Sequence, residues 1–213
     1  RIKLLSAVDV DTETQSIIWY GKSVALDERT LVVGAPFSII NGVRRLGGVF
    51  AYQRDGASGL HSPRSLVWPD QQAYENLGTP LVLHSEYLAA GAPAADVDGQ
   101  EDAGAVCIFA RGKDGAIEPR PTAVLTAADP AKNESFGAKL ALLGRRLLVG
   151  TSDPTDGESS VYVLEPAGAD LSRWLQVTRL RGSDTGAEFG SYSLAASGSL
   201  IYVGETFVFR RPP

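Results

Sequence analysis

The sequence is poor in the residues that build most catalytic and metal centres. It has one cysteine, Cys107, and two histidines, His61 and His84, among 213 residues. A lone cysteine cannot form an internal disulfide, and neither histidine has a second ligand residue at the spacing that zinc sites use. No nucleophile elbow, phosphate loop or dinucleotide fingerprint occurs either. The sequence therefore indicates a protein that is not an enzyme and that is stabilised by packing rather than by disulfides.

Three further absences restrict the class of protein. Methionine is missing altogether, and because a chain without it has no initiator of its own, we expect a processed or excised segment. Apolar runs such as 105–110 are far shorter than the ~20 residues of a membrane-spanning helix, so the chain should not be membrane-embedded. The net charge is −5, the pI is about 5.1 and no long run of Lys and Arg occurs. This acidity argues against binding to nucleic acid.

Glycine, by contrast, is abundant at 23 residues, and it marks a fourfold internal repeat. An aromatic residue or leucine followed by glycine recurs at spacings of 57, 59 and 53 residues. A second glycine closes an apolar run 13 residues after each of the first three markers and 14 residues after the last. The markers are Gly21, Gly78, Gly137 and Gly190, and the closing glycines are Gly34, Gly91, Gly150 and Gly204. We define repeat units over residues 20–76, 77–135, 136–188 and 189–213, the last completed by residues 1–19.

Each unit contains β-rich segments with period-two alternation and short connections, which predict an antiparallel meander. The first strands are expected at 21–26, 78–83, 137–142 and 190–195, and the second at 31–35, 88–92, 146–150 and 200–204. The third strands are expected at 48–53, 105–110, 160–164 and 206–210, and the fourth at 65–68, 121–127 and 174–181. A Leu-x-x-x-Asp motif recurs beside the fourth strands, and we interpret its aspartates as turn caps; they are Asp9, Asp70, Asp129 and Asp184.

The fourth unit has no fourth strand of its own, and residues 1–7 match the missing one. We therefore predict a single all-β domain, a β-propeller of four four-stranded antiparallel blades whose last blade is closed by the N-terminal strand. The alternative is that the chain forms part of a larger, seven- or eight-bladed ring.

The wording of the repeat resembles a known family. Residues 20–26 followed by 31–36, and 135–142 followed by 147–150, are similar to FG-GAP repeats of the integrin-α propellers, and residues 88–93 carry a second full Gly-Ala-Pro. The resemblance implies a non-catalytic interaction or scaffolding module of a cell-surface adhesion protein or a large assembly. It also implies an extracellular or cell-surface location and a protein partner bound through the loops between strands. The calcium loops of integrin-type blades are missing from the short turns between the first and second strands.

One loop nevertheless has the composition of a cation site. Between the second and third strands of the second unit stand Asp96, Asp98, Glu101 and Asp102, with a glycine at the bend. Several carboxylates from a tight loop are what calcium prefers. Calcium binding and a solvated acidic loop are both open interpretations, and no other cofactor is expected.

Two kinds of surface are candidates for ligands. The loops that differ most between units, 37–46 and 94–102, are expected to contact a protein partner, and the first of them carries Ile39, Ile40, Arg44 and Arg45. A loop that folds back could instead bury the isoleucines. The alternative is a carbohydrate-binding, lectin-like propeller that uses exposed aromatic rings, for which the candidates are Trp68, Tyr74 and Trp19, with Trp174 as a further possibility. Packing between blades explains a tryptophan equally well, and Cys107 is interpreted as a buried packing residue.

Overall fold

The computed structural model describes residues 15–16, 19–40, 47–55, 59–69, 75–152, 159–181, 189, 193–204 and 207–210. Within these ranges the chain is all-β, as predicted, and contains no helix. No helical segment that could span a membrane is therefore found in the described part of the chain. The strands form four antiparallel sheets and one additional two-stranded pair.

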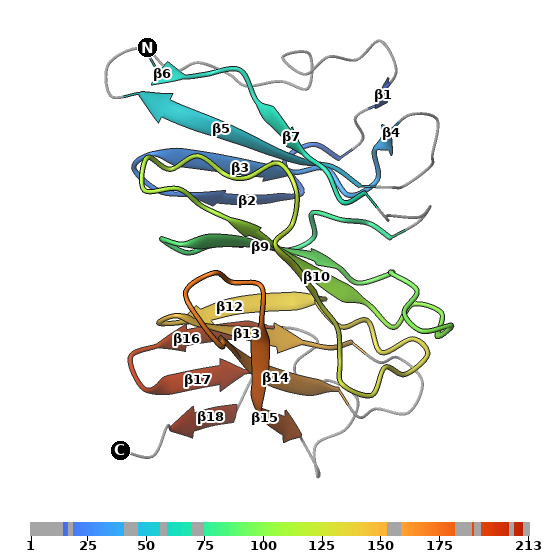
Figure 1. The fold of residues 1–213 in the computed structure, drawn as a ribbon. Coiled ribbons are helices and arrows are strands. Elements are labelled where there is room, and N and C mark those ends of the chain that lie inside the picture. The colour runs from blue at the N-terminus through green and yellow to red at the C-terminus, as the bar shows by residue number, and fades with distance from the viewer. Residues whose placement is uncertain are drawn as a thin grey trace.

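The four sheets follow one another along the chain, and we number them in that order (Figure 1). Sheet 1 contains β2 (Ser23–Leu26), β3 (Thr30–Gly34), β5 (Val49–Asp55) and β7 (Arg64–Leu66), with the short β6 (Gly59–Leu60) beside the end of β5. Sheet 2 contains β8 (Leu81–Leu83), β9 (Tyr87–Ala92), β10 (Ala105–Ala110) and β11 (Ala123–Leu125). Sheet 3 contains β12 (Lys139–Leu143), β13 (Arg146–Gly150), β14 (Ser160–Pro166) and β15 (Trp174–Arg181). Sheet 4 contains β16 (Leu194–Ser197), β17 (Leu200–Val203) and β18 (Phe207–Arg210).

Apart from β6, which was not predicted, each of these strands overlaps a predicted segment, and the strands of each sheet follow one another in the order of a meander. The pair β1 (Gln15–Ser16) and β4 (Ile39–Ile40) was not predicted. A two-residue strand leaves no alternation in the sequence, because period two needs at least four residues to become visible.

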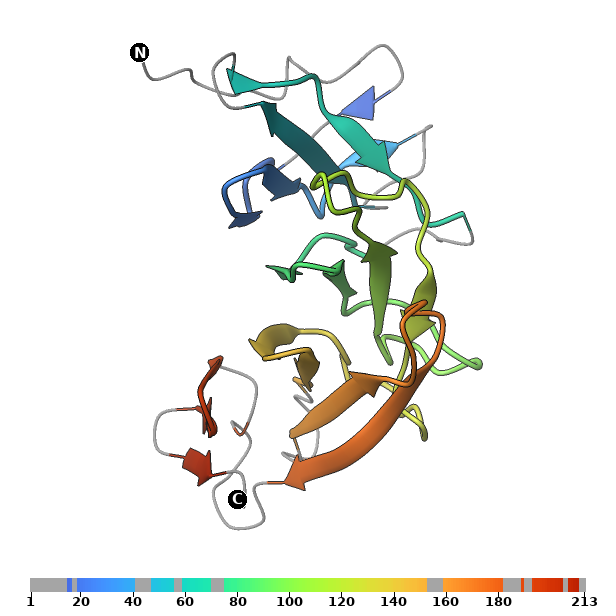
Figure 2. The same ribbon diagram turned by 60° about the vertical axis from the view of Figure 1, so that its left-hand side comes forward.

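The sheets stack face to face in a curved row (Figures 1 and 2). The first strands lie on the concave side, where β8 contacts both β2 and β12, and β12 contacts β16. Sheets 1 and 4 lie at opposite ends of the row in both views. A closed ring of four sheets is thus not confirmed by the described strands, and the expected closing strand at residues 1–7 lies outside the described residues.

Most of the hydrophobic core lies between the sheets, in one cluster for each neighbouring pair, and a fourth cluster around Phe50 lies on the other face of sheet 1. Val32 and Leu88 pack between sheets 1 and 2, Ile108 and Leu147 between sheets 2 and 3, and Leu148 among others between sheets 3 and 4. Strands β9 and β10 are buried along almost their whole length. A strand covered on both faces needs apolar residues on both, which explains why these strands read as nearly continuous apolar runs.

The glycines that mark the repeat lie where neighbouring sheets touch. A Cβ on Gly34 in β3 would stand 2.1 Å from the carbonyl oxygen of Gly78, and a Cβ on Gly91 in β9 would stand 2.4 Å from that of Gly137. Gly78 and Gly137 have φ values of 101° and 93°, a region that favours glycine. Among the described residues, the closing glycines of sheets 1 and 2 therefore pack against the marker glycine of the next sheet. We call this contact the glycine joint.

Candidate functional site

The acidic loop at residues 95–104 connects β9 to β10 and projects at the edge of the row (Figure 1). Its tip is a tight hairpin in which Val97 and Gln100 exchange two backbone hydrogen bonds of 2.8 and 3.1 Å. The two central residues, Asp98 and Gly99, have φ values of 50° and 79°, as a type I′ turn requires. The sequence suggested the Asp-Gly pair as part of a cation loop. The turn alone is enough to explain why these two residues stand there.

The next sheet holds this loop in place. Three consecutive carbonyl oxygens, those of Glu101, Asp102 and Ala103, accept backbone hydrogen bonds of 2.8, 2.9 and 2.8 Å. The donors are the N–H groups of Asn133, Ser135 and Phe136, in the segment that leads into sheet 3. The acidic loop is therefore fixed to the joint between sheets 2 and 3 rather than to its own sheet alone.

Its carboxylates are directed to different partners. Asp96 Oδ1 accepts the N–H of Asp102 at 2.9 Å, and Glu101 Oε2 lies 2.8 Å from Lys132 Nζ. The hydrogen bond and charge of Lys132 lower the pKa of Glu101, whereas burial, followed by the charges of Asp96 and Glu101, raises the pKa of Asp102. Asp96 and Asp98 are exposed.

Across the described ranges, no three Asp, Glu, His or Cys side chains converge in a geometry that would hold a metal ion. Calcium binding by the acidic loop stays a prediction.

The second predicted partner loop is described only in part. Ile39 and Ile40 form β4 and pair with Ser16 and Gln15, and the side chain of Ile39 is half-buried. Arg44 and Arg45 lie outside the described residues. The backbone of Ile39 and Ile40 is therefore held by a strand pairing, which the sequence did not reveal.

The predicted aromatic residues do not share one environment. Trp19 is 56% exposed, with its ring centroid 4.3 Å from that of Phe37 and Lys22 Nζ 5.0 Å above it. Trp68 is half-buried and packs against the core between sheets 1 and 2, in agreement with the packing interpretation. Tyr74 lies outside the described residues.

Trp174 lines a groove of about 540 Å³ between β11 and β15. Its indole Nε1 donates to the carbonyl oxygen of Leu171 at 2.9 Å, and its ring stands edge-on to Tyr87 at 5.2 Å. Four polar side chains line the same groove: those of Asp98, Thr126, Ser172 and Gln176. Trp174 was predicted only as a further possibility among the aromatic candidates, and its place as the first residue of the long strand β15 was the available signal.

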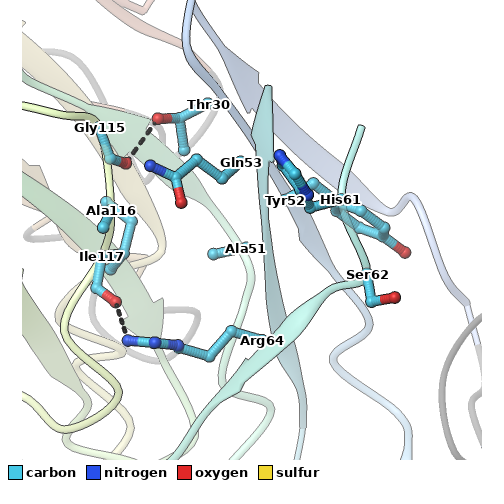
Figure 3. Close-up of a pocket in the computed structure, with 10 residues that line it drawn as sticks. All are labelled: Thr30, Ala51, Tyr52, Gln53, His61, Ser62, Arg64, Gly115, Ala116 and Ile117. Atoms are coloured by element: carbon cyan, nitrogen blue, oxygen red, sulfur yellow. Dashed lines mark hydrogen bonds between the residues drawn. The ribbon is translucent and has the colours of Figure 1, made fainter. Parts of the chain in front are cut away.

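A smaller pocket of about 140 Å³ lies between sheet 1 and the loop 111–120 that follows β10 (Figure 3). Thr30 Oγ1 donates to the carbonyl oxygen of Gly115 at 2.7 Å, and Arg64 Nη1 to that of Ile117 at 3.3 Å. These polar side chains anchor the loop, so the pocket is part of the contact between the two sheets.

At the same rim, Arg111 joins sheets 1 and 2. Its side chain is 6% exposed and lies 2.7 Å from Asp27 Oδ2, while Nη2 donates to Thr30 Oγ1 at 2.8 Å and Nη1 to the His84 carbonyl at 3.2 Å. Burial opposes ionisation of Asp27, but hydrogen bonds from Arg111 and from two backbone N–H groups outweigh it and lower the pKa of Asp27.

A buried carboxylate in the segment before sheet 3 is bound by two side chains of that sheet. Glu134 is 4% exposed, accepts the hydroxyl of Tyr162 at 2.6 Å and lies 3.5 Å from Arg179. Burial, together with the hydrogen bond to Glu134, raises the pKa of Tyr162. The sequence analysis missed this group, although Glu75 stands at the same distance before its own marker glycine and is also 4% exposed.

Neither the models of known protein families nor the curated protein sequences contain a match to this chain. The function is therefore inferred from the residues and their geometry.

Proposed function

We propose that the chain is a non-catalytic interaction module of the FG-GAP propeller kind, in which sheets 1 to 4 are blades. Three features support this: the four meanders in sequence order, the first strands on the concave side, and the glycine joints at the repeat markers. The extracellular or cell-surface setting belongs to the same proposal and rests on the resemblance. Propellers commonly bind through loops at one rim while the blades stay rigid.

The observation that carries the proposal is the way the acidic loop is held. Three backbone hydrogen bonds tie the carbonyl oxygens of residues 101–103 to the neighbouring sheet, and the tip is a type I′ turn. A loop that is ordered before it binds loses little conformational entropy on association. The loop therefore suits recognition of a partner surface better than it suits a hinge or lid.

The charge of this loop defines the partner's chemistry. Asp96 and Asp98 are exposed; Asp98 is one of the two central residues of the hairpin turn, and Asp96 lies just before it. An acidic projection favours a protein surface that carries Lys or Arg, and such rim charges chiefly increase association rate and specificity. The partner in this proposal is thus a protein with a basic patch.

Selection from a peptide-display library on the intact chain tests this proposal, followed by fluorescence anisotropy with the enriched peptides. Enriched peptides should be basic, and the double variant Asp96→Asn, Asp98→Asn should bind them at least about tenfold more weakly, or about 1.4 kcal/mol. Asparagine tolerates the left-handed turn position, so the loop keeps its shape. The matched control is Glu118→Gln, an exposed acid in the 111–120 loop, which should leave affinity unchanged. Enriched peptides that bind the double variant as tightly as the wild type would contradict the proposal.

A lectin-like function is the second candidate, and the groove beside Trp174 favours it. An aromatic side chain there lies among a carboxylate, two hydroxyls and an amide, a combination that suits a sugar's apolar faces and hydroxyl groups. On a glycan array, Gln176→Ala should abolish binding, whereas Gln100→Ala, which removes an exposed amide from the acidic loop, should not. An array without any bound glycan would exclude this candidate.

A further inference from the structure

Neighbouring sheets contact one another through a repeated pair of residues that lie opposite each other on the first and second strands. The pairs facing the next sheet are Ala25 with Val32, Val82 with Ala89, and Ala141 with Leu148. The pairs facing the previous sheet are Leu81 with Ala90, Leu140 with Val149, and Leu194 with Val203. All of them belong to the clusters between sheets. The same register position therefore makes the same contact at every internal joint.

At the sheet 1 end of the row, the corresponding position is open. Val24 lies opposite Val33 and is 50% exposed, whereas its counterparts Leu81 and Leu140 are 7% and 8% exposed. Leu26, on the same face of β2, is 71% exposed. On the same face of sheet 1, the part formed by β3 and β5 is not exposed, because Val33 and Phe50 are buried in one cluster. The open part is therefore the strip along the first strand.

At this end, the marker glycine has the conformation of a glycine joint, but no glycine of a preceding sheet packs against it among the described residues. Gly21 has a φ of 86°, close to the 101° and 93° of Gly78 and Gly137. A Cβ on Gly78 would stand 2.8 Å from the Gly48 carbonyl oxygen of the previous sheet, and one on Gly137 2.6 Å from that of Ala105. A Cβ on Gly21 would meet no atom of the described chain within 4 Å. Sheet 1 thus has the backbone conformation that receives a preceding sheet, and no sheet of the described residues occupies that position.

The residue two before the marker glycine gives an independent indication. Trp19 has a φ of 59°, like Asn76 at 57° and Ser135 at 53°. A Cβ on Gly47 would stand 2.9 Å from the carbonyl carbon of Asn76, and one on Gly104 would stand 2.8 Å from that of Ser135, so the previous sheet lies against both positions. Trp19 occupies the same position with 56% of its surface exposed. Asn76 and Ser135 are half-buried at this position, and a large apolar ring is less favourable than they are when it is left exposed there.

The other end of the row shows the complementary face. In sheet 4, the pair that faces onward is Ala195 with Tyr202. Its counterparts Val32 and Leu148 are fully buried, whereas Tyr202 is 43% exposed and Ala195 is also exposed. Sheet 4 therefore presents the surface that each earlier sheet buries against its successor.

We propose that the open strip of sheet 1, made of Trp19, Gly21, Val24 and Leu26, receives sheet 4 of a second copy of this chain. The two faces are positional counterparts of faces that join inside the row, and in one chain they lie at opposite ends of it (Figures 1 and 2). The contact is head to tail, so it closes when the rotations complete a turn. Two copies then form a ring of eight sheets, within the range of four to eight blades that propellers adopt.

The inference rests on the propeller arrangement in the proposed function, but not on the acidic loop, so the two can fail separately. Light scattering coupled to size exclusion, with small-angle X-ray scattering over a concentration series, measures it on the intact chain. The expected result is a compact dimer that dissociates at least tenfold more readily in Leu26→Lys and in Tyr202→Lys. Val124→Lys is the matched control, since Val124 is 41% exposed on β11, away from both ends, and it should leave the dimer unchanged.

Mixing the two weakened variants distinguishes this geometry from others. A Leu26→Lys chain and a Tyr202→Lys chain retain one intact joint between them, so the mixture should contain more dimer than either variant forms alone at the same concentration. Failure of the mixture to recover, a wild-type monomer at every concentration, or elongated oligomers would each overturn the proposal. Circular dichroism of each variant verifies that it is folded, and peptide binding by the acidic loop is scored separately.

Discussion

Gly34 and Gly78 bring two sheets into direct backbone contact, so close that a Cβ on Gly34 would stand 2.1 Å from the Gly78 carbonyl oxygen. The same oxygen accepts a hydrogen bond of 2.5 Å from Ser23 Oγ. The joint thus contains one polar contact, and it is possible only because Gly34 has no side chain. Gly91 approaches Gly137 in the same way. The main contacts of each described sheet are with its neighbours in the row, so stability depends on each such interface.

Replacing Gly34 with alanine should therefore destabilise the fold strongly. The added methyl group meets backbone atoms, which cannot rotate away, so we expect a loss of about 3 kcal/mol in the free energy of unfolding. Urea denaturation followed by tryptophan fluorescence measures it. Gly168→Ala is the control, since among the described residues its added Cβ would meet nothing nearer than a side-chain oxygen of Asp170 at 3.8 Å. Equal stability of the two variants would contradict the glycine joint.

The Asp27–Arg111 pair should make the free energy of unfolding depend on pH in the acid range. Asp27 has a pKa below the usual 3.8 in the folded chain, so the pair's contribution is present above pH 3.8 and is lost as the pH falls through the lower folded value. Asp27→Asn should cost about 1 kcal/mol at pH 7, a small value because the carboxylate is 41% exposed. The difference between variant and wild type should shrink as the carboxylate becomes protonated. A difference that stays constant down to the acid transition would argue against the ion pair.

Tyr162→Phe should destabilise the chain by about 1–3 kcal/mol, because it leaves the buried carboxylate of Glu134 without the hydroxyl donor. Burial and Glu134 raise the pKa of Tyr162 above the usual 10.0. The contribution of a raised pKa is complete below pH 10 and is lost as the pH rises beyond it, because the unfolded chain ionises first. Wild-type stability should therefore fall above pH 10, more steeply than that of Tyr162→Phe. Absorbance titration of the tyrosines, combined with urea denaturation at each pH, tests both statements.

The thiol of Cys107 should report global unfolding. The residue is fully buried in β10, and burial, followed by the charge of Glu75, raises its pKa well above 9.0. Because the thiolate is the reactive form, a thiol reagent should label the native chain only as fast as it unfolds. Rapid labelling under native conditions would mean that the core between sheets 1 and 2 opens locally.

The sequence predicted the strands well because the repeat carries two independent signals, alternation and glycine spacing. It could place Gly34 and Gly78 along the chain, but it could not show that they touch, since a contact between repeats leaves no pattern within either. The pairing of β1 with β4 was invisible for a different reason, because two residues carry no periodicity.

For the candidate site, the composition identified the acidic loop, but it did not identify the groups that hold the loop in place. Backbone N–H groups of Asn133, Ser135 and Phe136 fix that loop, and any residue except proline supplies such a donor. The partners of Glu134 were equally hidden, because Tyr162 and Arg179 come from two other strands. Arg44, Arg45 and Tyr74 lie outside the described residues, so their roles in partner or glycan binding stay predictions.

Amide hydrogen exchange of the intact chain at Asn133, Ser135 and Phe136 tests the central claim most directly, namely that the neighbouring sheet holds the acidic loop rigid. These amides should exchange as slowly as those of β9 and β10, and Gly91→Ala should accelerate them by opening the joint between sheets 2 and 3. Exchange at the rate of a solvated loop in the wild-type chain would show that the loop is not held, because the acidic side chains would then not be presented on a fixed surface.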